Sequence, residues 1–255
     1  MKRRVAHFCM IAAALLTSVM LAEFAYAQVK PGQTQEKAYQ VASVKIKPGM
    51  AIEWRNYLKN ELIPLMKKSG VTEFETWVTE FGDPDEFVML LPIKSMAELD
   101  GPSPFAAGGQ EGILELMAHL QRMVNSSRFS MIQSRSNLTI APKAGYVPKI
   151  GVLVTNTVAM DRVADFEKSS SMVMAAVGKT NAKGFLSSKL SLGGIPNTYY
   201  SLVLFDSFAD LEQFVPAFVK ALGEAKFGPE TGIVSQREYE VLRYIPELSI
   251  QPAAP

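Results

Sequence analysis

Residues 82–99 read GDPDEFVMLLPIKSMAEL, and residues 194–211 read GIPNTYYSLVLFDSFADL. The two stretches align without a gap, and identical residues recur in the same register: Gly82, Pro84, Leu90, Ser95, Ala97 and Leu99 match Gly194, Pro196, Leu202, Ser207, Ala209 and Leu211. The same register places Trp54 on Phe166. Self-similarity at a fixed spacing is the signature of a repeated structural unit. The sequence therefore predicts two copies of one unit.

Each copy alternates strand-like and helix-like segments in the order β-α-β-β-α-β, which is that of a ferredoxin-like unit. In the first copy, strands are expected over 39–46, 74–81, 87–93 and 129–137, with helices over 50–68 and 112–124. In the second copy, strands are expected over 150–158, 185–192, 198–205 and 237–245, with helices over 161–177 and 208–225. The predicted domains are 28–142 and 143–250, joined through APKAGYVP at 141–148 and followed by a tail at 251–255.

The third strand of each copy is apolar on both faces, because residues 87–93 read FVMLLPI and residues 199–205 read YYSLVLF. Continuous apolar runs of this kind are typical of strands that are buried on both sides. Helices cover only one face of a ferredoxin-like sheet, so the sheet of the other copy is the expected cover for the second face. We therefore expect an α+β fold in which two tandem ferredoxin-like (βαββαβ) units pack as an intramolecular α/β-barrel pseudo-dimer, with a filled core or a cavity between them.

Two local signals refine the helices. Pro64 lies inside the first predicted helix and is expected to kink it, because proline lacks an N–H donor and its ring clashes with the preceding turn. Ser95 with Glu98, and Ser207 with Asp210, have the spacing of a capping box and predict that a helix starts at each serine.

The N-terminus has the three parts of a signal peptide: Met-Lys-Arg-Arg, an apolar stretch over 10–21, and Ala25-Tyr26-Ala27 at the cleavage position. We expect cleavage after residue 27 and a periplasmic or secreted protein without a membrane anchor. Cleavage would remove Cys9 and His7, so the mature chain would have no thiol and one histidine. The charge is nearly balanced, with 26 basic and 25 acidic residues, which argues against binding of nucleic acid.

Three short motifs resemble a known family: IKPG at 46–49, ELIPL at 61–65 and TWVTEFG at 76–82. They are similar to NIPSNAP-type domains within the dimeric α/β-barrel superfamily, which includes antibiotic-biosynthesis monooxygenases. The resemblance implies paired ferredoxin-like units with a cavity. It also implies activities that range from cofactor-free oxygenases to haem-degrading enzymes and relatives of chlorite dismutase. No catalytic set of the family matches this chain. The relatives that hold haem use a histidine of the second repeat, and the second copy here has none.

His119 is the one candidate for a catalytic side chain, as a general base or a haem ligand, because it is the only imidazole of the mature chain. It lies at the edge of the apolar stripe of the helix expected over 112–124, where a histidine can also be structurally incidental. A single histidine without a cysteine argues against a metal site.

Aromatic and amide side chains supply the candidate lining of a ligand pocket: Trp77, Asn156, Tyr199 and Tyr200. Core packing is the alternative role for the aromatic residues. The sequence therefore favours an exported protein that binds a small hydrophobic or aromatic molecule, or that acts as an interaction module, without a cofactor. The alternative is a cofactor-free monooxygenase or haem-handling enzyme of the α/β-barrel type. A homodimer is left open.

Overall fold

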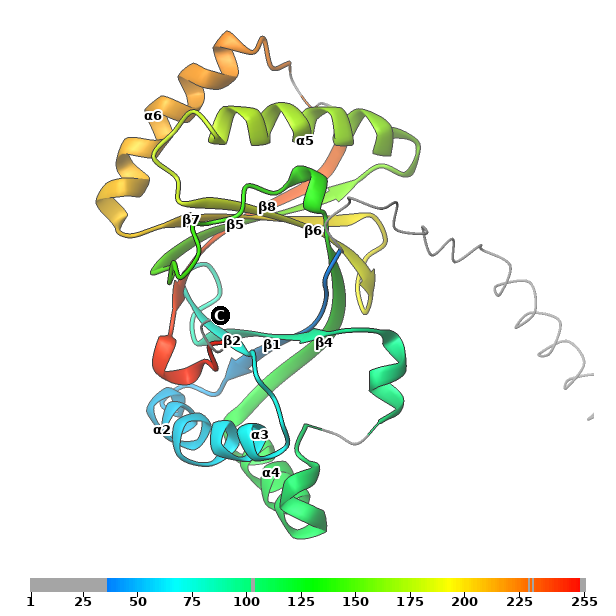
Figure 1. Cartoon of the computed structure of the whole chain (residues 1–255), viewed down its shortest axis with the longest axis vertical. Helices are drawn as coiled ribbons and strands as arrows, with labels where there is room; N and C mark the ends of the chain where they lie inside the picture. The colour runs from blue at the N-terminus through cyan, green and yellow to red at the C-terminus, as the bar shows by residue number, and fades with distance from the viewer. Residues whose placement is uncertain (1–35, 102–103, 229, 231, 253–255) are drawn as a thin grey trace, which may run out of the picture. The chain divides into compact units, whose positions relative to one another are not determined.

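The computed structural model describes residues 36–101, 104–228, 230 and 232–252. The predicted signal peptide at 1–27 lies outside the described residues. The described chain is an α+β structure in which helices cover two opposite sides of a closed antiparallel barrel of eight strands (Figure 1). None of its helices combines the length and the apolar character that are needed to cross a membrane.

The order of elements agrees with the predicted order in both halves. The first half contains β1 (Ala38–Ile46), α2 (Ala51–Tyr57), a π-helical segment (Leu58–Leu62), α3 (Ile63–Lys68), β2 (Glu75–Phe81), β3 (Glu86–Ile93), α4 (Gly109–Met123) and β4 (Val124–Ser134). The second half contains β5 (Ile150–Val158), α5 (Val163–Val177), β6 (Gly184–Leu192), β7 (Thr198–Phe205), α6 (Phe208–Glu224) and β8 (Val234–Tyr244).

The fourth strand of each half was predicted too short. We expected β4 to begin at Phe129 and β8 at Arg237, yet they begin at Val124 and Val234. Helix α4 passes directly into β4, since Val124 caps the helix and already has extended dihedral angles. After a half-buried valine at the start of each strand, the next residues are polar and exposed, so they carry no apolar periodicity from which a strand could be recognised.

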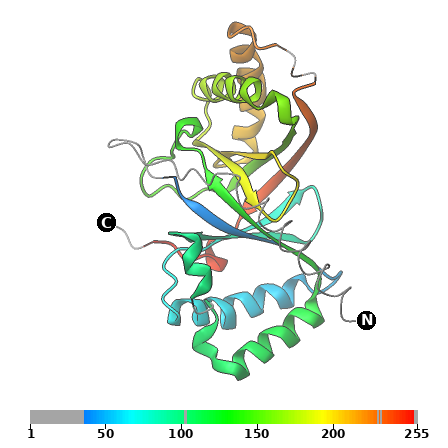
Figure 2. The ribbon, with the colours of Figure 1, turned by 90° about the vertical axis from the view of Figure 1, so that its right-hand side faces the viewer.

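The strands close a barrel in the order β1-β3-β2-β8-β5-β7-β6-β4, with β4 paired back to β1. The two halves therefore join edge to edge at two seams, β2–β8 and β4–β6. Helices α2, α3 and α4 cover the outer face of the first half, and α5 and α6 cover that of the second (Figures 1 and 2). Each sheet thus has helices outside and the opposite sheet inside, as the apolar third strands predicted.

A cluster of apolar side chains packs inside the barrel. Its buried members are Trp77, Leu204, Leu242 and Tyr244, which come from strands of both halves. Trp77 packs edge-on against Tyr244, with ring centroids 5.0 Å apart. Separate clusters under the helices hold the rest of the core, including Trp54 and Phe87 in the first half and Phe205 and Phe214 in the second. Core side chains therefore occupy part of the space between the sheets, while Val88, Leu90 and Leu202 of the same cluster are only partly buried.

Gly151 shows how tightly this interior is packed. A Cβ atom added to Gly151 would lie 2.7 Å from Cδ1 of Leu202 and 3.1 Å from Cζ3 of Trp77. We expect Gly151→Ala to lower the free energy of unfolding by about 1–3 kcal/mol in chemical denaturation, because overpacking a dense core forces side chains off their rotamers. Gly223→Ala in α6 is the control: no atom lies within 4 Å of the added Cβ, so stability should hold or rise slightly. Equal stability of Gly151→Ala and the unmodified chain would show that the interior is loose.

A short arm follows the last strand of each half and pairs with the other half. The first arm is residues 135–140, and the second arm is residues 245–250. Ile140 exchanges two backbone hydrogen bonds with Phe185, of 2.7 and 2.9 Å. Ile250 does the same with Phe74, at 2.8 and 2.9 Å. Each half is therefore completed by a segment of its partner half.

The side chains of the two arms repeat the same hydrogen bonds. Ser249 Oγ accepts from the N–H of Thr76 and donates to the carbonyl of Ile245. Thr139 Oγ1 accepts from the N–H of Ser187 and donates to the carbonyl of Arg135. The arms thus occupy equivalent places in the two halves, and the sequence did not predict them.

The first helix is interrupted at the predicted place by a π-helical segment. The N–H of Ile63 donates to the carbonyl of Leu58, five residues back, just before Pro64. The wider turn accommodates the proline, which can neither donate to nor closely approach the carbonyl of residue 60.

One of the two predicted capping boxes forms a cap. Ser207 Oγ accepts from the N–H of Asp210 at 3.1 Å and starts α6. Ser95 makes no such bond, and only a 3₁₀ turn (Met96–Asp100) follows it. Glu98 instead accepts from the N–H of Lys94 at 2.8 Å.

Candidate functional site

A groove of about 340 Å³ lies between the π-helical segment and α3 on one side and α4 on the other. Its lining is rich in carboxylates and consists of Tyr57, Glu61, Leu65, Gly108, Glu111, Gly112 and Glu115. This volume lies at the small end of the range for small-molecule sites. His119 lies beside the groove, four residues after Glu115 on α4.

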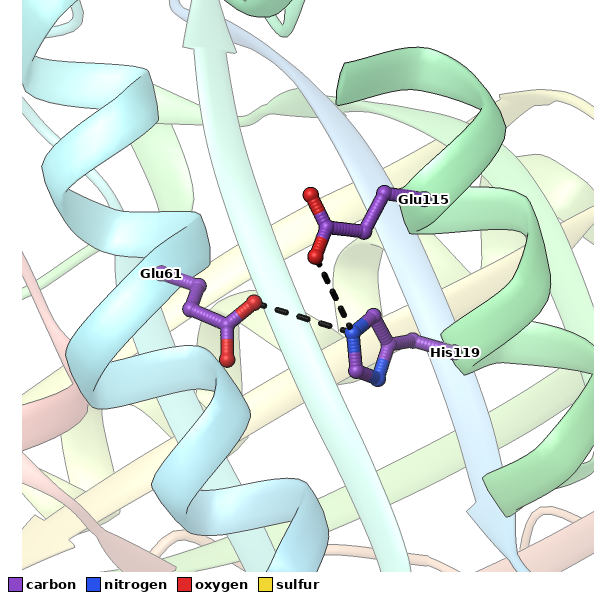
Figure 3. A group of neighbouring side chains, drawn as sticks. All are labelled: Glu61, Glu115 and His119. Atoms are coloured by element: carbon purple, nitrogen blue, oxygen red, sulfur yellow. Dashed lines mark ion pairs between the residues drawn. The ribbon is translucent and has the colours of Figure 1, made fainter. Parts of the chain in front are cut away.

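Three side chains converge at this groove from two elements. Glu61 projects from the π-helical segment, and Glu115 and His119 project from α4 toward it (Figure 3). His119 Nε2 lies 3.7 Å from a carboxylate oxygen of Glu61 and 3.9 Å from one of Glu115. The ligand atoms of the three residues all lie within 4.8 Å of one another. The imidazole is thus bracketed by two carboxylates.

Local structure explains this convergence. Glu115 and His119 are four residues apart on α4 and therefore share one face of the helix. Glu61 lies in the π-helical segment, whose extra residue per turn changes the direction of its side chains relative to a regular helix. Such π segments occur frequently at functional sites.

Tyr57 forms the floor beside the imidazole. Its ring stacks on His119 with centroids 4.3 Å apart, and its residue surface is only 6% exposed. Burial raises the pKa of Tyr57 to about 12, and the negative charges of Glu61 and Glu115 add to this shift. The phenol is therefore protonated at neutral pH and can donate a hydrogen bond rather than act as a base.

Arg122 contacts the other nitrogen of the imidazole. Its Nη2 lies 3.2 Å from His119 Nδ1 and 2.6 Å from a carboxylate oxygen of Glu53. A guanidinium only donates hydrogen bonds, so in this arrangement Nδ1 accepts and the ring proton resides on Nε2. The Nε2–H edge therefore faces the two carboxylates of the groove.

The arrangement is chemically suited to a positively charged guest. Glu61, Glu111 and Glu115 all line the groove, and Arg122 is already paired with Glu53. The carboxylates of Glu61 and Glu115 are 50% and 63% exposed, so both side chains can turn toward a guest. Two carboxylates and one imidazole also match the ligand preferences of divalent transition metals.

Trp77 and Tyr200, two of the predicted ligand-binding residues, belong to the inner face of the barrel. Trp77 is part of the buried interior cluster, and its Nε1 donates to Glu75 at 3.1 Å. Tyr200 alternates along β7 with Leu202 and Leu204 of the same cluster. Burial raises the pKa of the Tyr200 phenol, so it too is a donor at neutral pH.

Asn156 and Tyr199, the other two, belong to the outer face. They are paired across β5 and β7 and are almost completely buried. Tyr199 packs against Phe166 of α5, with centroids 4.8 Å apart. The structure therefore divides the four predicted residues between two faces of one sheet, and they do not line one common space.

The sequence identified His119 but not its partners. Glu115 was visible as the residue four positions before it, and this spacing is the only local signal of the site. Glu61 comes from a distant segment, and its position depends on the π-helical segment, so no pattern within α4 could reveal it.

No protein-family model matches the chain, and no curated protein matches its sequence. Solved structures match it in fold. A candidate monooxygenase from Lactobacillus acidophilus NCFM has 12% identity and a TM-score of 0.58, over 87% of this chain and 99% of its own. A mutant chlorite dismutase from Candidatus Nitrospira defluvii, in complex with cyanide, has 10% identity and a TM-score of 0.53, over 83% and 92%.

A NIPSNAP family protein from Agrobacterium tumefaciens str. C58 also matches, with 14% identity and a TM-score of 0.32 over 43% of this chain and 95% of its own. The monooxygenase-like and dismutase structures confirm the fold that the resemblance predicted. At these identities the likeness establishes the fold, and the chemistry has to be argued from the site itself.

Proposed function

We propose that the protein binds a divalent metal ion at the Glu61–Glu115–His119 cluster and holds a small molecule beside the ion in the adjoining groove. The observation that supports this proposal is the convergence of three ligand atoms within 4.8 Å at the edge of a groove of about 340 Å³. The groove is acidic, so we propose a polar or cationic guest in place of the hydrophobic molecule that the sequence favoured.

Small side-chain movements would complete the site. Zinc and similar ions bind nitrogen and carboxylate oxygen at about 2.0–2.2 Å. Ligand atoms around one ion are then about 3–3.5 Å apart, compared with the 3.7 and 3.9 Å found from His119 Nε2 to the two carboxylates. Nε2 would bind the ion after losing its proton to Nδ1, and Arg122 would turn fully to Glu53.

The test is a titration of the mature chain with Zn²⁺ and Mn²⁺, followed by calorimetry. We expect saturable binding that weakens more than about tenfold in His119→Ala and in Glu61→Gln, because each variant removes one ligand. Glu212→Gln, which alters an exposed carboxylate on α6, is the control and should bind as the unmodified chain does. The ion should also lower the pKa of Tyr57 from about 12, since it neutralises Glu61 and Glu115. Binding that is absent, or unchanged in both ligand variants, would refute the metal site.

Proton transfer by His119 is the second candidate function. The imidazole lies beside the groove, and histidine is the most common general base in enzymes. For this role the ring proton has to move from Nε2 to Nδ1, with Arg122 turned fully to Glu53, so that Nε2 can accept a proton from a substrate in the groove. A cofactor-free oxygenase needs such a base, and one of the similar structures is a candidate monooxygenase. Proton transfer by His119 would use the same residues but would require no metal ion.

Haem does not fit at His119. The groove is at the small end for any ligand, and Glu61, Glu111 and Glu115 would face the propionates of haem with like charge. His119 is therefore not proposed as a haem ligand.

We also infer that the chain is exported through residues 1–27 and that its halves arose by duplication. The equivalent arms and the matching strand registers support duplication: Val44 pairs with Phe87 just as Asn156 pairs with Tyr199. Because the described strands close on themselves, a homodimer would have to form through the outer helices rather than by pairing of sheet edges.

A further inference from the structure

We propose that Arg135, Lys189 and Tyr199 form a second binding site, on the outer face of the second half, for a single oxyanion group such as a carboxylate. The site lies at the β4–β6 seam under α5, in the opposite half from the His119 groove (Figure 1). It is independent of the metal site proposed above.

The first half shows what this place looks like as ordinary core. There Val78 pairs with Phe87, Val44 pairs with Phe87 on the other side, and Ile245 starts the arm. All of these side chains are at most 8% exposed. The equivalent positions therefore make a simple apolar cluster in one half of the fold.

The second half replaces these apolar residues with polar ones. Tyr199 occupies the position of Phe87, and Lys189, its partner on β6, occupies the position of Val78. Asn156, its partner on β5, occupies the position of Val44. Arg135 starts the arm in place of Ile245. Asn156 Oδ1 accepts from Arg237 Nε at 2.6 Å, so this replacement is satisfied within the protein. Because burying polar groups costs free energy, the other three replacements around Tyr199 point to a functional site rather than packing.

Two of the new side chains have unused donors. Arg135 and Tyr199 are 7% and 1% exposed, yet Nη1 of the arginine and the hydroxyl of the tyrosine have no hydrogen-bond partner. The guanidinium carbon lies 5.0 Å from the centre of the Tyr199 ring, so both groups belong to one location. A buried donor without an acceptor costs about 1–3 kcal/mol, and an acceptor on a ligand would recover it.

The local charge selects an anion. Lys189 Nζ lies 5.3 Å from the centre of the same ring and forms no ion pair with the described residues. Among the described residues, Glu167 of α5 is the one carboxylate that pairs with Arg135, at 2.7 Å, and it is 44% exposed. The site thus contains two cations, of which only Arg135 has a carboxylate partner, and a guest that carries one negative charge would balance it.

The geometry also limits the guest. Nη1 of Arg135 and the hydroxyl of Tyr199 each offer one donor, which suits the oxygens of a carboxylate or of a phosphoryl group. Lys189 is only partly buried and marks the side that is open to solvent. We therefore expect one oxyanion group to enter past Lys189 while the rest of the molecule remains outside.

The test uses acetate and inorganic phosphate, each titrated into the mature chain at constant ionic strength with chloride as the reference anion. Binding is followed by calorimetry and by the shift in thermal unfolding. We expect saturable binding that weakens about tenfold in Tyr199→Phe and in Lys189→Met, since each loses one donor. Tyr199→Phe restores the residue type of Phe87 and should fold well. Binding of either anion supports the site, and the pattern shows whether it prefers a carboxylate or a phosphoryl group.

Two further variants make the result specific. Glu167→Gln removes the carboxylate that competes for Arg135, so affinity should rise about tenfold. Lys220→Met, on the exposed face of α6, should change nothing. The proposal is overturned if neither anion binds more than chloride does, since the free donors would then hold only water. It is equally overturned if Tyr199→Phe and Lys189→Met bind as tightly as the unmodified chain. Metal binding at His119 should be unaffected in all four variants.

Discussion

Residues 28–142 expressed alone are expected to aggregate or to dimerise instead of giving a folded monomer. The fragment would lose both seams, so the edges of β2 and β4 would be left unpaired. Its inner face would expose Trp77, Val88 and Leu90 to water. It would also lack the second arm, which pairs with Phe74 and Thr76. Size-exclusion chromatography with light scattering measures the outcome directly.

Co-expression supplies the control for this experiment. Residues 28–142 and 143–255 produced together should associate one to one, because each half then regains two seams and the arm of the other half. A monomeric fragment 28–142 that unfolds cooperatively would contradict the argument that the two halves complete each other.

Elements with a local signature were predictable from the sequence. The duplicated stretch set the order of strands and helices, and apolar periodicity located most of them. The cover for the third strands was also predictable, because a run such as FVMLLPI needs apolar contacts on both sides. The start of β4 was mispredicted because its residues are polar and show no apolar alternation. The helix predicted after Ser95 does not continue, since Gly101 and Pro102 follow within seven residues.

The placement of side chains was less predictable. Tyr199 and Tyr200 are adjacent on one strand, and a shift of one position decides whether a side chain faces the helices or the barrel. Sequence alone gave no means of deciding that parity, so both were assigned to one pocket. Contacts between distant segments were also hidden. Glu61 reaches His119, and Arg135 reaches Tyr199, only through the closed fold.

Removal of the second arm is expected to have the other large effect on stability. A chain that ends at Ile245 lacks Leu248 and Ile250, which are 2% and 6% exposed in the core of the first half. Each large-to-small loss in a core costs about 2–5 kcal/mol, and the arm also supplies the backbone bonds to Phe74. The sum approaches the whole stability of a typical domain, about 5–15 kcal/mol, so this truncation should unfold much of the protein.

A chain that ends at Gln251 retains the entire second arm and should match the full chain in denaturant titrations. An unchanged midpoint for the chain ending at Ile245 would mean that the arm is dispensable. Single substitutions then compare the two arms: Leu248→Ala and Leu138→Ala remove equivalent side chains, each 2% exposed. We expect each substitution to lower the free energy of unfolding by about 2–5 kcal/mol, because loss of the leucine side chain leaves a cavity in the opposite half. A large cost at one arm and none at the other would show that only one half depends on its partner.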